Sequence, residues 1–172
     1  MRFPIEGVTE FTEDQLEARV TVTNRISKPA YYLGIAKAVS ERSTCLRRRY
    51  GAVIVRNDRI VATGYNGAAR GCKNCCDVGF CARKDVPHGE RYELCKAVHA
   101  EQNAIMQAGQ ELTNGATLYL TGTDAETGKV LTDIDCCMMC KRAVINAGID
   151  KVVFANGNDD YAEFDPRVWR EE

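Results

Sequence analysis

The chain has 172 residues, of which 45% are hydrophobic, and its formal net charge at pH 7 is −1. That length suits one domain with a real core and is too short for two, so we expect a single domain over residues 1–172. The balanced charge excludes the basic surface that holds a long nucleic acid, and no apolar run reaches the length of a membrane span. We therefore expect a small-molecule ligand and no membrane or nucleic-acid partner.

The N-terminal stretch MRFPIEGVTEFTEDQL is interrupted by Pro4 and by acidic side chains, and it contains no apolar core of signal-peptide length. The chain carries nine cysteines, an odd number that cannot close completely into disulfide pairs. We expect a cytoplasmic protein whose cysteines are metal ligands or small buried side chains. Six cysteines precede His99 and three follow it, so they are clustered rather than scattered.

Hydrophobic periodicity predicts helices and strands in alternation. The stretch PAYYLGIAKAVSERS has helical spacing, and YGAVIVRNDRIVATGYN is typical of two strands joined by a turn at Asn57 and Asp58. Residues 64–93 are rich in glycine and cysteine, which predicts a long irregular segment. The pattern then predicts four elements: a helix over 95–108, a strand over 116–122, a helix over 137–147 and a strand over 151–155.

The predicted order α-β-β-α-β-α-β indicates an α/β fold. We expect a three-layer α/β/α domain with a central mixed sheet of about five strands. The polar stretch DAETGK lies within the region 122–135, and it predicts a small hairpin around Thr127 and Gly128.

Two polar side chains, His99 and Glu101, interrupt the otherwise apolar stretch VHAEQNAI. Zinc prefers imidazole and thiolate ligands, and a catalytic zinc site has three protein ligands with water in the fourth position. Cys137 and Cys140 are three residues apart, so at a helix start they share one face near the positive end of the helix dipole, where thiolates are favoured. We predict a catalytic Zn²⁺ held by His99, Cys137 and Cys140, with Glu101 carrying the proton of the water.

A His-x-Glu motif followed by a Cys-x-x-Cys pair is the signature of zinc deaminases. Through HAEQNAI, CCMMC followed by INAGI, GAVIV and ATGYNGA, the chain resembles the cytidine and deoxycytidylate deaminase family over about residues 31–154. The resemblance implies a cytidine deaminase-like fold and hydrolytic deamination of a cytosine ring. The stretches STCLRRRYGAVIV and GYNGAARG are most similar to the deoxycytidylate (dCMP) branch, which implies conversion of dCMP to dUMP, the precursor of dTTP.

Four residues are candidate substrate contacts. The resemblance places a substrate-side asparagine at Asn66, although an Asn-Gly pair is also typical of a plain turn. The glycine-rich stretch GYNGAARGCK follows a strand and carries Arg70, a combination suited to a phosphate. We expect the backbone N–H of Ala100, at a helix N-terminus, to hold the ring carbonyl. Tyr119 is either a stacking surface for the pyrimidine or a core residue. The run of arginines over 47–49 is typical of a solvated face and less often binds phosphate.

Four further cysteines resemble the second, structural zinc site that some members of the dCMP branch carry: Cys45, Cys75, Cys81 and Cys95. The first two match the family positions directly, whereas the other two fall near them, so Cys72, Cys76 and His88 stay open as substitutes. A closed thiolate site would contribute folding free energy and would explain how so long an irregular segment stays ordered.

One departure from the family pattern lies next to the predicted ligands. Cys136 occupies the position where the family has proline, which leaves the entry to the helix less constrained and offers a competing thiolate. We prefer Cys137 as the ligand because only Cys137 keeps the two-residue gap to Cys140. The region 122–135 is a second departure, since the family usually runs directly from the strand to this motif.

The resemblance also implies a homo-oligomer, with dCTP as an activator and dTTP as an inhibitor. Three other functions stay open: a cytidine or deoxycytidine deaminase, a tRNA adenosine deaminase and a non-catalytic zinc module. An isoelectric point of about 6.2 argues against the RNA enzyme. The presence of Glu101, which has no structural task in a zinc site, argues against the non-catalytic module.

Overall fold

The computed structural model describes residues 25–87, 89–158 and 160–171, so the first part of the predicted domain and His88 lie outside the described residues. The central sheet has five strands in the order β2-β1-β5-β6-β7. Only the β5–β6 pair is parallel, which confirms the predicted mixed sheet. The bounds are as follows: β1 Arg48–Arg56, β2 Arg59–Tyr65, β5 Thr117–Asp124, β6 Lys151–Asn156 and β7 Asp160–Phe164.

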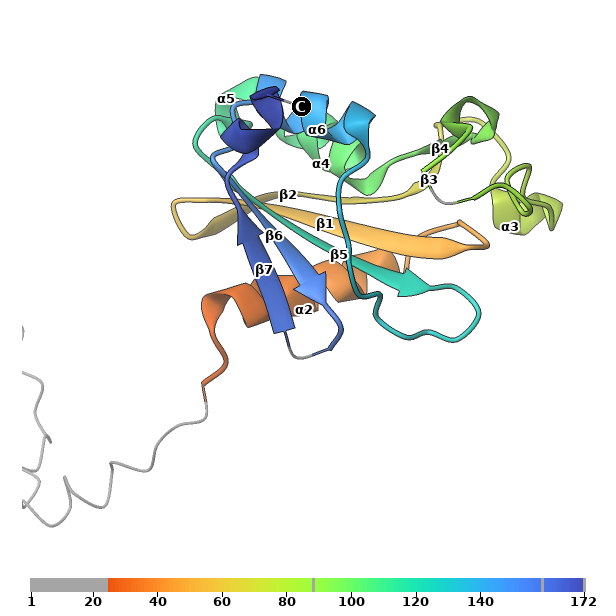
Figure 1. The fold of residues 1–172 in the computed structure, drawn as a ribbon, viewed down its shortest axis with the longest axis horizontal. Helices are drawn as coiled ribbons and strands as arrows, with labels where there is room; N and C mark the ends of the chain where they lie inside the picture. Colours follow the sequence, from red (N-terminus) through yellow and green to blue (C-terminus); the bar gives the residue numbers. More distant parts are fainter. Residues whose placement is uncertain (1–24, 88, 159, 172) are drawn as a thin grey trace, which may run out of the picture.

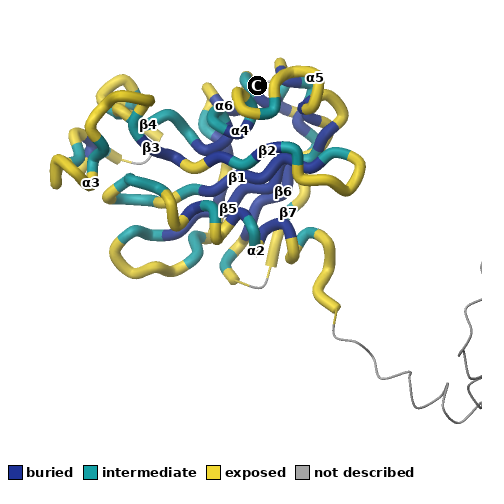
Figure 2. Tube along the Cα trace, turned by 180° about the vertical axis from the view of Figure 1, so that it is seen from behind, coloured by how far each residue is buried: buried dark blue, intermediate teal, exposed yellow. Residues whose placement is uncertain are grey.

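Helices cover both faces of this sheet, which confirms the predicted three layers (Figure 1). One face carries α2, and the other carries α4, α5 and α6 together with the C-terminal 3-10 helix η2. Buried residues concentrate on β1, β5 and β6 in the middle of the sheet (Figure 2). The helical elements have these bounds: α2 Lys28–Ser40, α4 Ala100–Ala108, α5 Gln110–Thr113, α6 Met138–Asn146 and η2 Pro166–Glu171.

Two glycines allow helices to pack closely against the sheet. A Cβ atom on Gly51 of β1 would lie 2.0 Å from the carbonyl oxygen of Ala36 in α2. A Cβ atom on Gly64 of β2 would lie 2.3 Å from the carbonyl oxygen of Ala100 in α4. Both distances are far shorter than a real contact, so these positions accept only glycine without a shift of the helix. Gly64 therefore brings the start of α4 directly onto the sheet.

The turns of the hairpins follow the sequence predictions. Asn57 and Asp58 both have positive φ, as the two-residue turn between β1 and β2 requires. Residues 123 and 130 form an isolated antiparallel bridge, and Gly128 lies in the left-handed region, so the predicted small hairpin is present.

The segment predicted as irregular contains short elements and forms the exposed end of the molecule (Figure 2). Strand β3 (Gly67–Ala68) pairs with β4 (Ala97–Val98), and α3 (Cys75–Val78) and the 3-10 helix η1 (Tyr92–Leu94) lie between them. The helix predicted over 95–108 begins instead at Ala100, because β4 takes part of its predicted first turn. The sequence does not predict strand β7, because this edge strand has mostly exposed side chains and so lacks an apolar pattern.

Candidate metal centre and active site

Two helix N-termini bring the predicted zinc ligands together. His99 is the N-cap residue of α4, and Cys137 is the N-cap residue of α6, with Cys140 in the first turn of that helix. The Nδ1 atom of His99 lies 3.4 Å from Sγ of Cys137 and 3.3 Å from Sγ of Cys140. Within the described part of the chain, this is the only group of three or more His, Cys, Asp or Glu residues whose ligand atoms all lie within 4.8 Å of one another.

The donor set fits zinc. Zn–N and Zn–S bonds of about 2.0 and 2.3 Å in a tetrahedral arrangement separate nitrogen and sulfur by about 3.5 Å. The two nitrogen–sulfur distances in the structure are close to this value. The geometry also assigns Nδ1, rather than Nε2, as the ligand nitrogen of His99.

Neighbouring groups favour a thiolate at this position. The pKa of the Cys137 thiol is lowered to about 4, mainly because the Cys140 thiol donates a hydrogen bond to it and also because of His99. The pKa of Cys140 is raised by that same hydrogen bond and by burial. The opposite shifts mean that the two thiols share one proton, so the pair loses its first proton easily. The N-terminus of α6 adds to this effect.

Glu101 lies beside the three ligands without belonging to their cluster. Its side chain is buried, and burial raises the pKa of its carboxyl, an effect that its own backbone N–H and His99 partly oppose. A carboxyl group with a raised pKa in a buried position is suited to moving protons near neutral pH. The predicted division between three ligands and one proton carrier therefore agrees with the geometry.

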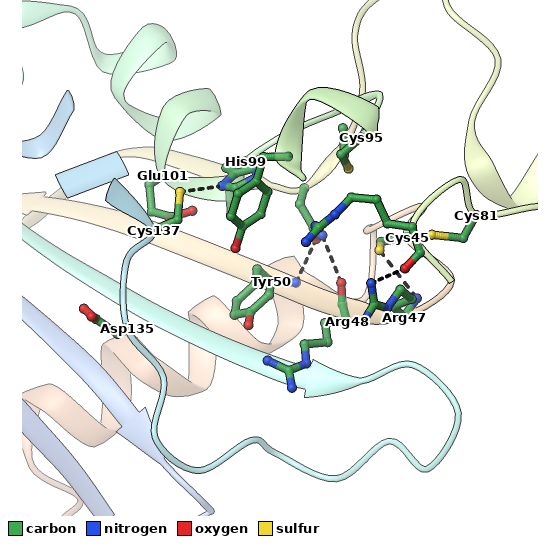
Figure 3. Close-up of a pocket in the computed structure, with 15 residues that line it drawn as sticks. Cys45, Arg47, Arg48, Tyr50, Cys81, Cys95, His99, Glu101, Asp135 and Cys137 are labelled. Carbon is green, nitrogen blue, oxygen red and sulfur yellow. Dashed lines mark hydrogen bonds between the residues drawn. The ribbon is translucent and has the colours of Figure 1, made fainter. Parts of the chain in front are cut away.

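A cavity of about 90 Å³ opens next to this cluster (Figure 3). Figure 3 shows His99, Glu101 and Cys137 at one end of the cavity and Cys45 and Cys81 at the other. Ala100 and Asn66 also line it, as predicted for substrate contacts.

The amide of Asn66 is engaged by the protein itself. Its Oδ1 accepts hydrogen bonds from the backbone N–H of Tyr50 at 2.8 Å and from the hydroxyl of Ser43 at 2.6 Å. Its Nδ2 donates to the carbonyl oxygen of Arg48 at 2.9 Å. Asn66 therefore fixes the cavity wall where the end of β2 lies beside the beginning of β1, and one N–H of its amide is left for another partner.

The structure separates two predicted contacts from the cavity. Arg70 is exposed and does not line it. Tyr119 is buried against Tyr32 of α2, with ring centroids 4.9 Å apart, on the face of the sheet opposite α4. These positions do not support the predicted phosphate contact of Arg70 or the predicted base stacking of Tyr119.

Arg83, which sequence reasoning did not single out, lies on the cavity wall instead. Its guanidinium carbon is 4.2 Å from the centroid of the Tyr92 ring, and that ring meets the His99 ring edge-on at 5.2 Å. Arg83 is only 8% exposed, and its Nε has no hydrogen-bond partner among the described residues. No motif marks this arginine, because its position depends on how the segment between β3 and β4 folds.

The four cysteines of the predicted second site are neighbours but do not form a closed cluster. Cys45, Cys81 and Cys95 line the cavity, and a second hollow is lined by Cys75, Cys81 and Cys95. The pKa of the Cys75 thiol is raised, mainly by burial and to a smaller extent by the negative charges that the other three cysteines carry when ionised. The alternatives Cys72 and Cys76 are exposed.

Comparison with known proteins agrees with this site. A family model described as the cytidine and deoxycytidylate deaminase zinc-binding region matches residues 26–156. The chain belongs to this family. The match includes His99, Glu101, Cys137 and Cys140 and ends before β7 and η2.

Several curated relatives are named deoxycytidylate deaminase. The chain is 36% identical to that of Schizosaccharomyces pombe, covering 76% of this chain and 37% of the relative. It is 34% identical to that of Saccharomyces cerevisiae, covering 83% and 42%. The match to the enzyme of Mycobacterium phage D29 is 37% identical and covers 72% of this chain and 91% of the relative. The chain thus spans well under half of the two yeast relatives but nearly all of the phage relative.

Solved structures also resemble this fold. The dCMP deaminase from the cyanophage S-TIM5, in complex with dCMP and dUMP, is 26% identical, with a TM-score of 0.54 over 76% of this chain and 83% of that chain. A cytidine deaminase from Burkholderia pseudomallei, at 20% identity and a TM-score of 0.53 over 82% of this chain and 94% of that chain, shares the fold. Among the helices that the structure describes, none is long and apolar enough to span a bilayer.

Proposed function

We propose that this protein is a zinc-dependent hydrolase that deaminates dCMP to dUMP and releases ammonia. The observation that carries the proposal is the buried Glu101 carboxyl beside a His, Cys, Cys cluster with zinc-like spacing. The relatives named deoxycytidylate deaminase support dCMP as the substrate. The role of dUMP as a dTTP precursor in pyrimidine nucleotide metabolism follows from this reaction.

The chain's own residues divide the chemistry between them. His99, Cys137 and Cys140 would hold the zinc ion, which when bound supplies activation of a water molecule near neutral pH. Glu101 accepts the proton of that water and delivers it to ring N3, so that C4 becomes open to attack. After the water oxygen has bonded to C4, Glu101 accepts its second proton and passes it to the amine, so that the C4–N bond breaks, ammonia leaves and the C4 carbonyl forms. The backbone N–H of Ala100, at the N-terminus of α4, would hold the ring carbonyl.

The phosphate of dCMP needs a cation, and our candidate is Arg83, the most buried of the three arginines that line the cavity. Its terminal NH2 group donates to the carbonyl oxygens of Pro87 and Glu90, which leaves Nε without a partner among the described residues. By contrast, Arg47 uses two of its nitrogens on the carbonyl oxygens of Arg83 and Val86. Because Tyr92 lies between Arg83 and His99, a nucleotide whose base faces Glu101 would extend its phosphate toward Arg83.

Several finer features belong to the same proposal. A single domain over 1–172 would hold two zinc ions, the second bound by Cys45, Cys75, Cys81 and Cys95. The family resemblance supports a homo-oligomer with dCTP and dTTP as effectors. Nine free cysteines support a cytoplasmic location, since a reducing compartment keeps thiols reduced.

The test measures zinc content and ammonia release from dCMP on one preparation. Glu101→Gln should keep the zinc and lose about 100-fold or more of kcat, because it removes the proton carrier. His99→Ala and Cys140→Ala should lose zinc and activity together. Loss of zinc in Glu101→Gln would contradict the assignment of Glu101. Zinc-loaded wild-type protein that releases no ammonia from dCMP would overturn the substrate, and deoxycytidine and a tRNA stem-loop are the comparison substrates.

A further inference from the structure

The entry to α6 is held by a hydrogen bond that a proline could not make. Cys136 precedes the candidate ligand Cys137, and its side chain is 3% exposed. Its backbone N–H donates to Oδ1 of Asp135 at 2.7 Å. Proline has no N–H and instead restricts φ by its ring. The residue in front of the first thiolate is therefore constrained here through a side chain rather than through a ring.

The other carboxylate oxygen of Asp135 links this hydrogen bond to helix α6. Its Oδ2 lies 3.1 Å from Nζ of Lys141, whose side chain is only 11% exposed. Lys141 directly follows the ligand Cys140 in α6. A buried ammonium group is costly unless it is paired, and Asp135, whose side chain is 57% exposed, is one partner of this ammonium.

The C-terminal 3-10 helix completes the connection. Nζ of Lys141 lies 5.2 Å from the centroid of the Trp169 ring, and Trp169 is a buried residue of η2, which packs against α6. Trp169 lies beyond residue 156, where the family match ends. A residue outside the matched region thus covers the lysine that holds Asp135.

We propose that Trp169, Lys141 and Asp135 are positioning residues that fix the backbone at Cys136 and Cys137 and thereby slow the release of zinc. This inference rests on the zinc site of the proposed function. Asp135 acts through the backbone, because its Oδ1 accepts the backbone N–H of Cys136, and Figure 3 shows its carboxylate apart from His99 and Tyr50. Partners that orient metal ligands without touching the metal typically change metal affinity by about 10- to 100-fold when they are removed.

The test measures the rate of zinc transfer to a chromogenic chelator. Lys141→Met keeps an apolar side chain against Trp169 and removes the charge, and Asp135→Ala removes both carboxylate contacts. Each should speed zinc release by about tenfold. Because both act through one connection, the double variant should release zinc no faster than Asp135→Ala alone. Lys151→Met is the matched control, since Lys151 forms an exposed ion pair with Glu163 on β6 and β7 and should leave the rate unchanged.

A second readout separates positioning from general stability. Lys141→Met leaves Asp135 without this partner, but the Asp135 side chain is 57% exposed and water can solvate its charge, so the Tm of zinc-free Lys141→Met should not fall. An unchanged release rate in Lys141→Met, or effects of the two substitutions that multiply, would overturn the inference. Faster zinc release matched by an equal loss of stability in the zinc-free protein would overturn it as well.

A proline background provides a further check. In Cys136→Pro the ring replaces the hydrogen bond, so Lys141→Met should there change the release rate by less than about twofold. A full tenfold effect in that background would contradict the inference. The comparison in the wild-type background decides the question even if the proline variant does not fold. Zinc-binding protein without deaminase activity would refute the proposed function alone, since the release rates can still be measured.

Discussion

Substitution of Arg83 by glutamine tests how the site distinguishes a nucleotide from a nucleoside. Arg83 is buried, and its Nε has no partner among the described residues, so a phosphate there would receive charge-assisted hydrogen bonds. Hydrogen bonds to charged groups contribute about 1.5–3 kcal/mol each. We therefore expect Arg83→Gln to lower kcat/KM for dCMP by about 10- to 100-fold, mainly through KM.

The same variant should leave deoxycytidine almost unaffected, because deoxycytidine has no phosphate to lose. The wild-type preference for dCMP over deoxycytidine, expected to be at least about 100-fold, should then largely disappear. Arg70→Gln is the control, since Arg70 is exposed and does not line the cavity. Steady-state ammonia release on both substrates, with zinc content measured in parallel, makes the comparison. Equal losses on the two substrates would show that Arg83 only supports the loop, and an unchanged preference would place the phosphate elsewhere.

Three further predictions address packing, pH and metal content. Gly64→Ala should cost about 1–3 kcal/mol of unfolding free energy and lower Tm, because the new Cβ meets α4, whereas Gly34→Ala, with nothing within 4 Å, should not destabilise the protein. The pKa of Tyr32 is raised to about 12, so the folded state keeps a proton that the unfolded chain loses above about pH 10. Chemical unfolding should therefore show stability falling between about pH 10 and 12, and falling less in Tyr32→Phe. Metal analysis of loaded protein should give two zinc ions per chain in wild type and in Cys72→Ser but one in Cys75→Ser, and a single ion in wild type would contradict the second site.

Much of the fold could be predicted because its signals are local. Asn57 and Asp58 tolerate positive φ and stand between two apolar runs, so the hairpin was evident. The start of α4 was placed too early, because the apolar pattern continues through Ala97 and Val98 without a break. Only the pairing of these two residues with Gly67 and Ala68 shows that they are extended, and that pairing depends on the whole segment between them.

The same distinction explains which site residues could be found. His99, Glu101 and the two cysteine ligands lie at two helix starts, so short motifs contain them. Arg83 lies in the segment between β3 and β4, where no periodicity indicates what its side chain meets. For Tyr119 the sequence leaves the choice between the cavity and the core open, because β5 is buried on both faces and an apolar strand does not show which side chains face which helix layer.

The three candidate zinc ligands come from two connections between strands that are far apart in the chain. His99 begins the helix that follows β4, whereas the two cysteines lie in the crossover from β5 to β6. Strand β5 stands between β1 and β6, so the crossover reaches His99 only through contacts between segments that are distant in sequence. We expect the three donors to meet only in a late step of folding, because contacts between distant parts of the chain form slowly. A zinc ion that arrives earlier meets two thiols and no imidazole, and acquisition of the metal should accordingly report that the centre of the sheet has closed.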